Sequence, residues 1–193
     1  MKNTEIMTIL QQCPRSLFTT EDLKKLLNIA KENTLYKRIE RLINQGILLS
    51  ITKGKYRYAY KEANDFEIAN FIHNPSYLSF ESALNFYGIL IQTPYQMLSA
   101  TTARSKTIEV NNKEYRYIHL SPELYFGYRK EKNFLIAYPE KAIIDQLYIT
   151  IKGLGTIDKK DLDLNKINRK RMTTFTKRIK NKLLKKKIGE FWK

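Results

Sequence analysis

The chain has 193 residues, 42% of them hydrophobic, and carries 35 basic against 19 acidic side chains, a formal net charge of +16. This apolar content is enough for a core and excludes a disordered chain, and the positive charge indicates a polyanionic partner such as nucleic acid. The single cysteine, Cys13, excludes an intrachain disulfide and suits a reducing compartment. No apolar run is long enough for a signal peptide or a membrane span, so we expect a cytoplasmic protein.

The charge is unevenly distributed along the chain. Residues 1–61 carry 12 basic and 5 acidic side chains, residues 62–165 carry 11 and 13, and residues 166–193 carry 12 and 1. A nearly neutral middle segment is therefore flanked by two basic segments. This pattern predicts two separate anion-facing regions instead of a uniformly lysine-rich surface.

The first sixty residues predict three short helices. Apolar residues at helical spacing indicate a helix over 4–12, which Pro14 ends. Thr19 and Asp22 form a capping-box pattern that opens a second helix. The third helix is predicted over 33–45.

The third helix has one apolar and one polar face. Leu35, Ile39, Leu42 and Ile43 recur at helical spacing, and Gly46 is a typical residue just after a helix C-terminus. The opposite face gathers the hydrogen-bonding and cationic residues Asn33, Thr34, Lys37, Arg41 and Asn44, with Arg38 beside them. Such a face suits contact with nucleic acid.

Two β-prone runs, 47–52 and 55–60, follow this helix. They are separated by Lys53 and Gly54, which predict a hairpin turn. Three helices and a hairpin predict a winged helix-turn-helix DNA-binding domain over residues 1–61. The predicted DNA-binding residues are Asn33, Thr34, Lys37, Arg38, Arg41, Asn44, Lys53, Lys55 and Arg57. RNA or protein binding is the alternative for the same domain.

Residues 66–193 predict a second domain that mixes helices and strands, so the fold class is α+β. Helices are expected over 66–73 and after Ser79, the latter closed by Gly88. Strands are expected over 107–110 and 115–120 and near 125–128. The run 134–148 predicts a short strand and then a helix that has Pro139 or Glu140 near its start.

The basic C-terminal segment predicts one helix over 168–187. Its apolar stripe is Met172, Phe175, Ile179 and Leu183. The possible additional nucleic-acid contacts are Arg169, Lys170, Arg171, Lys177, Arg178 and Lys180. A solvated helix is the alternative, and the stripe is too narrow to favour membrane binding.

The sequence shows no strong catalytic or metal-binding pattern. His73 and His119 are the only histidines and do not have the spacing of metal ligands. Glu123, Glu140 and Asp145 with Lys141 are faintly similar to a metal-dependent nuclease centre. Glu140 and Asp145, however, diverge by about 140° around a helix. We therefore expect no catalytic residue, no metal and no cofactor.

Three segments carry a resemblance to a known family. Tyr77–Leu90, Thr101–Leu120 and Ile136–Tyr148, preceded by a winged unit, resemble the AbiEi-type antitoxins of bacterial abortive-infection, type IV toxin–antitoxin systems. The resemblance covers roughly residues 5–150, and no single motif in it is diagnostic. It implies an N-terminal winged helix-turn-helix followed by a mixed α/β antitoxin domain.

The resemblance also implies the partners. The winged domain would bind inverted repeats in double-stranded operator DNA and repress its own operon. The second domain would counteract a cognate nucleotidyltransferase-type toxin without a stable complex. We expect no membrane partner, and a monomer in solution or a dimer on DNA. The alternatives are an RNA-binding protein that shields the toxin's RNA target and a metal-dependent nuclease.

Overall fold

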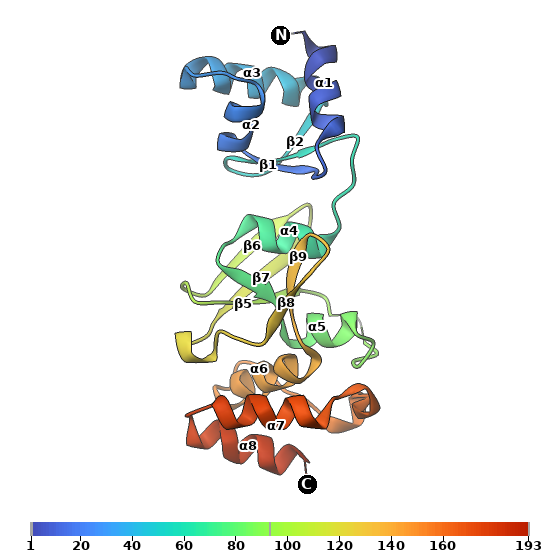
Figure 1. Cartoon of the computed structure of the whole chain (residues 1–193), viewed down its shortest axis with the longest axis vertical. Coiled ribbons are helices and arrows are strands. Elements are labelled where there is room, and N and C mark those ends of the chain that lie inside the picture. The colour runs from blue at the N-terminus through green and yellow to red at the C-terminus, as the bar shows by residue number, and fades with distance from the viewer. Residues whose placement is uncertain (1, 93, 193) are drawn as a thin grey trace. The chain divides into compact units, whose positions relative to one another are not determined.

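The computed structural model describes residues 2–92 and 94–192, and it divides the chain into two units, Met1–Ile72 and His73–Lys193 (Figure 1). The boundary was predicted in the polar bridge 61–65, between domains 1–61 and 66–193. The division falls at the end of the next helix instead, so this helix belongs to the first unit.

The first unit combines helices with a three-stranded antiparallel sheet whose strand order is β1-β3-β2. Its elements are α1 (Asn3–Gln12), β1 (Leu17–Thr19), α2 (Thr20–Leu26), α3 (Glu32–Asn44), β2 (Leu48–Thr52), β3 (Lys55–Tyr58) and α4 (Asp65–Ile72). The three predicted helices and the predicted hairpin are all present. Strand β1 was not predicted, because three residues are too few to show an alternating pattern.

The core of the first unit lies between helices α1, α2 and α3 and the sheet. The buried side chains include Ile6, Leu10, Phe18, Leu23, Leu35, Ile39, Leu42, Leu48, Tyr56 and Tyr58. The predicted capping box is confirmed: the Thr19 hydroxyl accepts from the Asp22 N–H at 3.1 Å, and the Asp22 carboxylate accepts from the Thr19 N–H at 2.8 Å. Gly46 follows α3 with φ +67°, the left-handed conformation that glycine adopts without steric cost.

The second unit is built on a six-stranded mixed sheet with the order β6-β7-β5-β4-β9-β8. Its strands are β4 (Ser76–Leu78), β5 (Met97–Thr101), β6 (Lys106–Val110), β7 (Lys113–His119), β8 (Tyr128–Glu131) and β9 (Phe134–Ala137). Its α-helices are α5 (Phe80–Phe86), α6 (Pro139–Ile151), α7 (Arg169–Arg178) and α8 (Lys182–Trp192). Strands β4 and β5 were not predicted, and β5 is buried at every position, so it lacks alternation.

The helices of the second unit form layers on this sheet. Helices α5 and α6 contact the sheet and each other, and α7 and α8 pack against α6 (Figure 1). Helix α6 is consequently buried along most of its length. The basic C-terminal segment is therefore an integral layer of this unit.

Two local predictions in this unit were wrong. The strand expected near 125–128 begins only at Tyr128, because residues 122–124 form a 3-10 helix. Ser79 does precede α5, but its side chain does not cap the helix. Its hydroxyl instead donates to the Asp145 carboxylate at 2.7 Å, a partner that lies 66 residues further along the chain.

The single helix predicted over 168–187 is interrupted. Ile179 has extended backbone angles, φ −72° and ψ 132°, and Asn181 caps the next helix by accepting from the Leu184 N–H at 3.0 Å. The register of the apolar face therefore shifts by one residue. Leu183 is 58% exposed, whereas Leu184 and Ile188 are buried.

The described helices include none that is both long and apolar enough to cross a membrane.

Candidate nucleic-acid interface

Helix α3 is held so that its polar face points outward. Leu35, Ile39 and Leu42 are buried on its inner side, with 1%, 3% and 0% of their surface exposed. The predicted contact residues Asn33, Thr34, Lys37, Arg41 and Asn44 are all exposed, and Arg38 is half-buried. Periodicity predicted this face correctly, because burial of the opposite stripe fixes the rotation of the helix about its axis.

The orientation of α3 is reinforced at its C-terminal end. The Asn3 side-chain amide of α1 donates to Gln45 Oε1 at 2.7 Å, just beyond the last turn of α3. The chain then reverses at Gly46 and enters β2. Helix α3, which carries the polar face, is therefore held by a hydrogen bond to α1 at its C-terminal end. Its buried residues pack in the core that it shares with the sheet.

A hollow of about 470 Å³ lies beside α3. Its lining combines apolar side chains from α1 and the α2–α3 connection with polar and cationic side chains: Ile6, Leu27, Asn28, Ile29, Thr34, Lys37, Arg38 and Arg41. None of these lining residues is acidic. Three cations at the edge of an apolar hollow create a local positive potential that suits an anionic ligand.

Two of these cations are unengaged. Neither the Lys37 nor the Arg41 side chain has a hydrogen bond or ion pair with any residue of 2–92 or 94–192. Glu40, also exposed, lies about 60° from Lys37 around the helix and borders the cationic face. The face is therefore cationic at its centre and acidic along one margin.

The β2–β3 hairpin differs from a freely projecting wing. Its turn is attached to the start of α2, because the Thr20 N–H donates to the Gly54 carbonyl at 3.0 Å. Lys53 is exposed at the tip, and Arg57 is half-buried in β3. The hairpin presents Lys53 next to the N-terminus of α2.

Lys55 has a different role from the predicted phosphate contact. Its ammonium donates to the carbonyls of Phe71 and Ile72 at 2.9 and 2.8 Å and lies 5.5 Å from the Phe71 ring centre. These carbonyls end α4, where the helix dipole favours a cation. We therefore remove Lys55 from the set of candidate DNA contacts. Phe71 and Ile72 lie 16 and 17 residues further along the chain, so no local sequence pattern linked Lys55 to them.

The cations of the basic tail fall into two groups. Arg171 lies 4.4 Å from the Tyr138 ring centre and 3.3 Å from the Glu140 carboxylate, and Arg178 lies 4.3 Å from the Phe126 ring centre. Both guanidinium groups therefore help to hold α7 against the unit. The other cations of the predicted set, Arg169, Lys170, Lys177 and Lys180, are exposed, as is Arg178.

The acidic residues considered for a nuclease centre have structural partners. Glu140, at the start of α6, is 1% exposed and accepts from the Asn168 N–H at 2.7 Å and from Arg171. Asp145 is 1% exposed and pairs with Lys141 one turn earlier. Glu140 and Asp145 thus belong to two separate networks. The described ranges hold no group of three or more His, Cys, Asp or Glu side chains that could bind a metal ion.

The Lys141–Asp145 pair is the most buried charged group in the described residues. The Asp145 carboxylate also accepts from the hydroxyls of Tyr77 and Ser79, at 3.0 and 2.7 Å. Desolvation by burial lowers the pKa of Lys141 and raises the pKa of Asp145, and the attraction between the two charges opposes both shifts. Burial also raises the pKa of Tyr77 well above its usual value. The i,i+4 spacing of Lys141 and Asp145 was the one feature of the local sequence that indicated this pair.

Comparison of the sequence with protein-family models and with curated proteins finds no match.

Proposed function

We propose that this protein is a DNA-binding transcription regulator whose first unit acts as a winged helix-turn-helix. The order helix, strand, two helices and hairpin is that of such a domain. The observation that carries the proposal is the outer face of α3. It presents exposed amide, hydroxyl and cationic side chains, and its two central cations, Lys37 and Arg41, are free to accept a ligand.

In this proposal α3 enters the major groove of duplex DNA. Arg41 would recognise the O6 and N7 acceptors of guanine, and Asn33 and Asn44 would recognise adenine. Arg38, Lys53 and Arg57 would contact phosphates and fix the position of the helix without reading sequence. Thr34 and Lys37 lie between these groups and can serve either purpose.

The biological role that we propose follows the resemblance to AbiEi-type antitoxins. The protein would repress its own operon by binding inverted repeats, one copy on each half-site, as a monomer in solution that pairs on DNA. The second unit would oppose a nucleotidyltransferase-type toxin. Its resembling segments Tyr77–Leu90 and Ile136–Tyr148 contain α5 and most of α6, and these two helices pack against each other.

The test is a gel shift with the full chain at one salt concentration. The probes are the DNA upstream of its own gene, a scrambled duplex of equal length and structured RNA. Wild type is compared with Lys37→Ala/Arg41→Ala. The matched control is Lys159→Ala/Lys160→Ala, which removes two equally exposed charges from the second unit.

We expect wild type and the control to prefer the upstream duplex. The α3 variant should lose this preference, with at least a 10-fold weaker affinity, because a lost bidentate base contact costs about 1–3 kcal/mol. Equal binding of all duplexes, preference for RNA, or equal losses in the two variants would contradict the proposal.

A further inference from the structure

A groove between α7 and α8 is the second hollow bordered by cations. The two helices each pack against α6, and the space between them has a volume of about 480 Å³. It is lined by Arg169, Met172, Thr173, Thr176, Lys177, Lys185, Ile188, Gly189 and Trp192. Its size is that of a site for a small molecule or for one part of a larger ligand.

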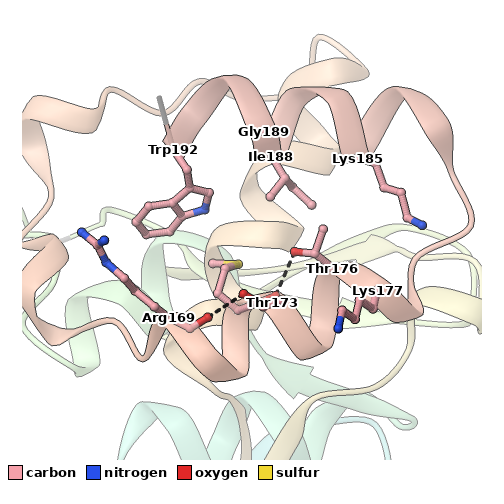
Figure 2. Close-up of a pocket in the computed structure, with 9 residues that line it drawn as sticks. Arg169, Thr173, Thr176, Lys177, Lys185, Ile188, Gly189 and Trp192 are labelled. Atoms are coloured by element: carbon pink, nitrogen blue, oxygen red, sulfur yellow. Dashed lines mark hydrogen bonds between the residues drawn. The ribbon is translucent and has the colours of Figure 1, made fainter.

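The floor of the groove is apolar, and Met172 and Ile188 are 5% and 3% exposed. Figure 2 shows the Trp192 indole at one end, on the same side as Arg169, and Lys177 and Lys185 at the other end. An aromatic ring beside an apolar floor suits a flat, weakly polar group. Cations at both ends suit negative charges on both sides of that group.

The groove also offers unused hydrogen-bonding capacity. The Trp192 Nε1 donor is buried and has no partner among the described residues. The hydroxyls of Thr173 and Thr176 donate to the carbonyls of Arg169 and Met172, at 2.9 and 2.8 Å (Figure 2). Their oxygen atoms therefore remain available as acceptors. A ligand could thus donate hydrogen bonds to these threonine oxygens.

The surroundings identify the ligand as a polyanion. None of the lining residues is acidic, and the exposed cations Lys170, Lys180, Lys182 and Lys186 lie on the same two helices or on their connection. A small organic acid needs only one cation. A chain of phosphates with flat groups between them matches both the charge at the two ends and the apolar centre.

We propose that the α7–α8 groove binds single-stranded nucleic acid by accepting one unstacked base against Trp192. Arg169 contacts the phosphate on one side of that base, and Lys177 and Lys185 contact the phosphate on the other side. This site is separate from the duplex-binding face of α3 and does not depend on it.

The chain itself supplies the probe, because Trp192 is its only tryptophan. A base that stacks on the indole should quench its fluorescence. The ligands are oligo(dT) and oligo(U) of equal length, which distinguish DNA from RNA, and an abasic strand of the same length. The abasic strand retains the phosphates and removes only the bases.

Gly189 offers a variant that blocks the groove without changing its charge. A Cβ at this position would meet no other described part of the chain within 4 Å, and the residue lies within α8. Gly189→Leu should therefore fill the groove and leave the helix intact, and Gly189→Ala is the matched control that leaves the groove open. Affinity is measured by the anisotropy of a labelled strand.

We expect quenching by the strands that carry bases and none by the abasic strand. Gly189→Leu should raise Kd by roughly 10-fold or more, the scale of one base stacked on an aromatic side chain, and Gly189→Ala should not. Lys37→Ala/Arg41→Ala should bind these strands like wild type, which separates this test from the test of α3.

Three results would overturn the proposal. Equal quenching by the abasic strand would mean that only phosphates are bound. Unchanged affinity in Gly189→Leu would place the strand outside the groove. Absence of quenching by every strand that carries bases would mean that no base stacks on Trp192.

Discussion

The buried ion pair of Lys141 and Asp145 matters most at the scale of single residues. Both side chains are at most 1% exposed, and the carboxylate holds the hydroxyls of Tyr77 and Ser79. Removing one charge leaves the other buried without an opposite charge, and this costs far more than the pair itself contributes to stability.

We expect Lys141→Met to lower the free energy of unfolding by about 3–5 kcal/mol, because Asp145 would be left without its cation. Lys141→Met/Asp145→Leu should recover part of this loss, because it removes both charges. Urea denaturation measures both variants.

The control for this prediction is Lys186→Met, which breaks an exposed pair of the same i,i+4 spacing with Glu190. It should cost less than about 1 kcal/mol. Equal losses of unfolding free energy in Lys141→Met and in Lys141→Met/Asp145→Leu would contradict this account. They would mean that burying the Asp145 carboxylate is not costly without the Lys141 charge.

The capping box of α2 is the clearest case at the scale of an element. Burial acts to raise the pKa of Asp22, but hydrogen bonds from Thr19 and the Arg15 guanidinium outweigh it and lower this pKa. The folded state therefore binds the proton of Asp22 less tightly than the unfolded state does. The resulting stability is complete above the unfolded pKa and disappears as the pH falls through the lower folded value.

We expect Asp22→Asn to lower the free energy of unfolding at pH 7 by about 0.5–2 kcal/mol, the usual range for a capping residue. The difference from wild type should shrink as the pH falls below about 4, because Asp22 itself becomes protonated. Urea denaturation at a series of pH values measures this. Glu21→Gln, an exposed neighbour in the same turn, should show no such convergence, and a constant difference for Asp22→Asn would contradict the assignment.

At the scale of the whole molecule, the net charge of +16 is concentrated in residues 1–61 and 166–193. Duplex binding through α3 should therefore weaken steeply with salt, since every neutralised phosphate releases counterions. Lys55, Arg171 and Arg178 have partners within the protein, so fewer cations are available than the sequence suggests.

We expect Lys37→Ala/Arg41→Ala to make the slope of log K against log salt shallower by at most about 1, since a phosphate contact contributes about 0.9 and of the two only Lys37 is placed to make one. The measurement is a titration with duplex DNA between about 50 and 200 mM salt. Lys159→Ala/Lys160→Ala should leave the slope unchanged. A slope that depends only on the total charge removed would argue against a defined interface on α3.

Local signals were sufficient for much of the first unit. The apolar spacing of α3, the Thr19–Asp22 capping box and the glycine that follows α3 are properties of neighbouring residues. Burial of one stripe of α3 necessarily exposes the other, so the candidate DNA-binding face was predictable as well. The segregation of charge also follows from the sequence alone.

Contacts between distant residues decided the rest. Lys55 could be removed from the interface only after the end of α4 was seen beside it, and Ser79 could be assigned only with Asp145 in place. The break at Ile179 shifted the buried face from Leu183 to Leu184 and Ile188 and opened the groove at Trp192. The position of this break depends on how α7 and α8 pack against α6, because packing selects one of several registers that the local sequence permits.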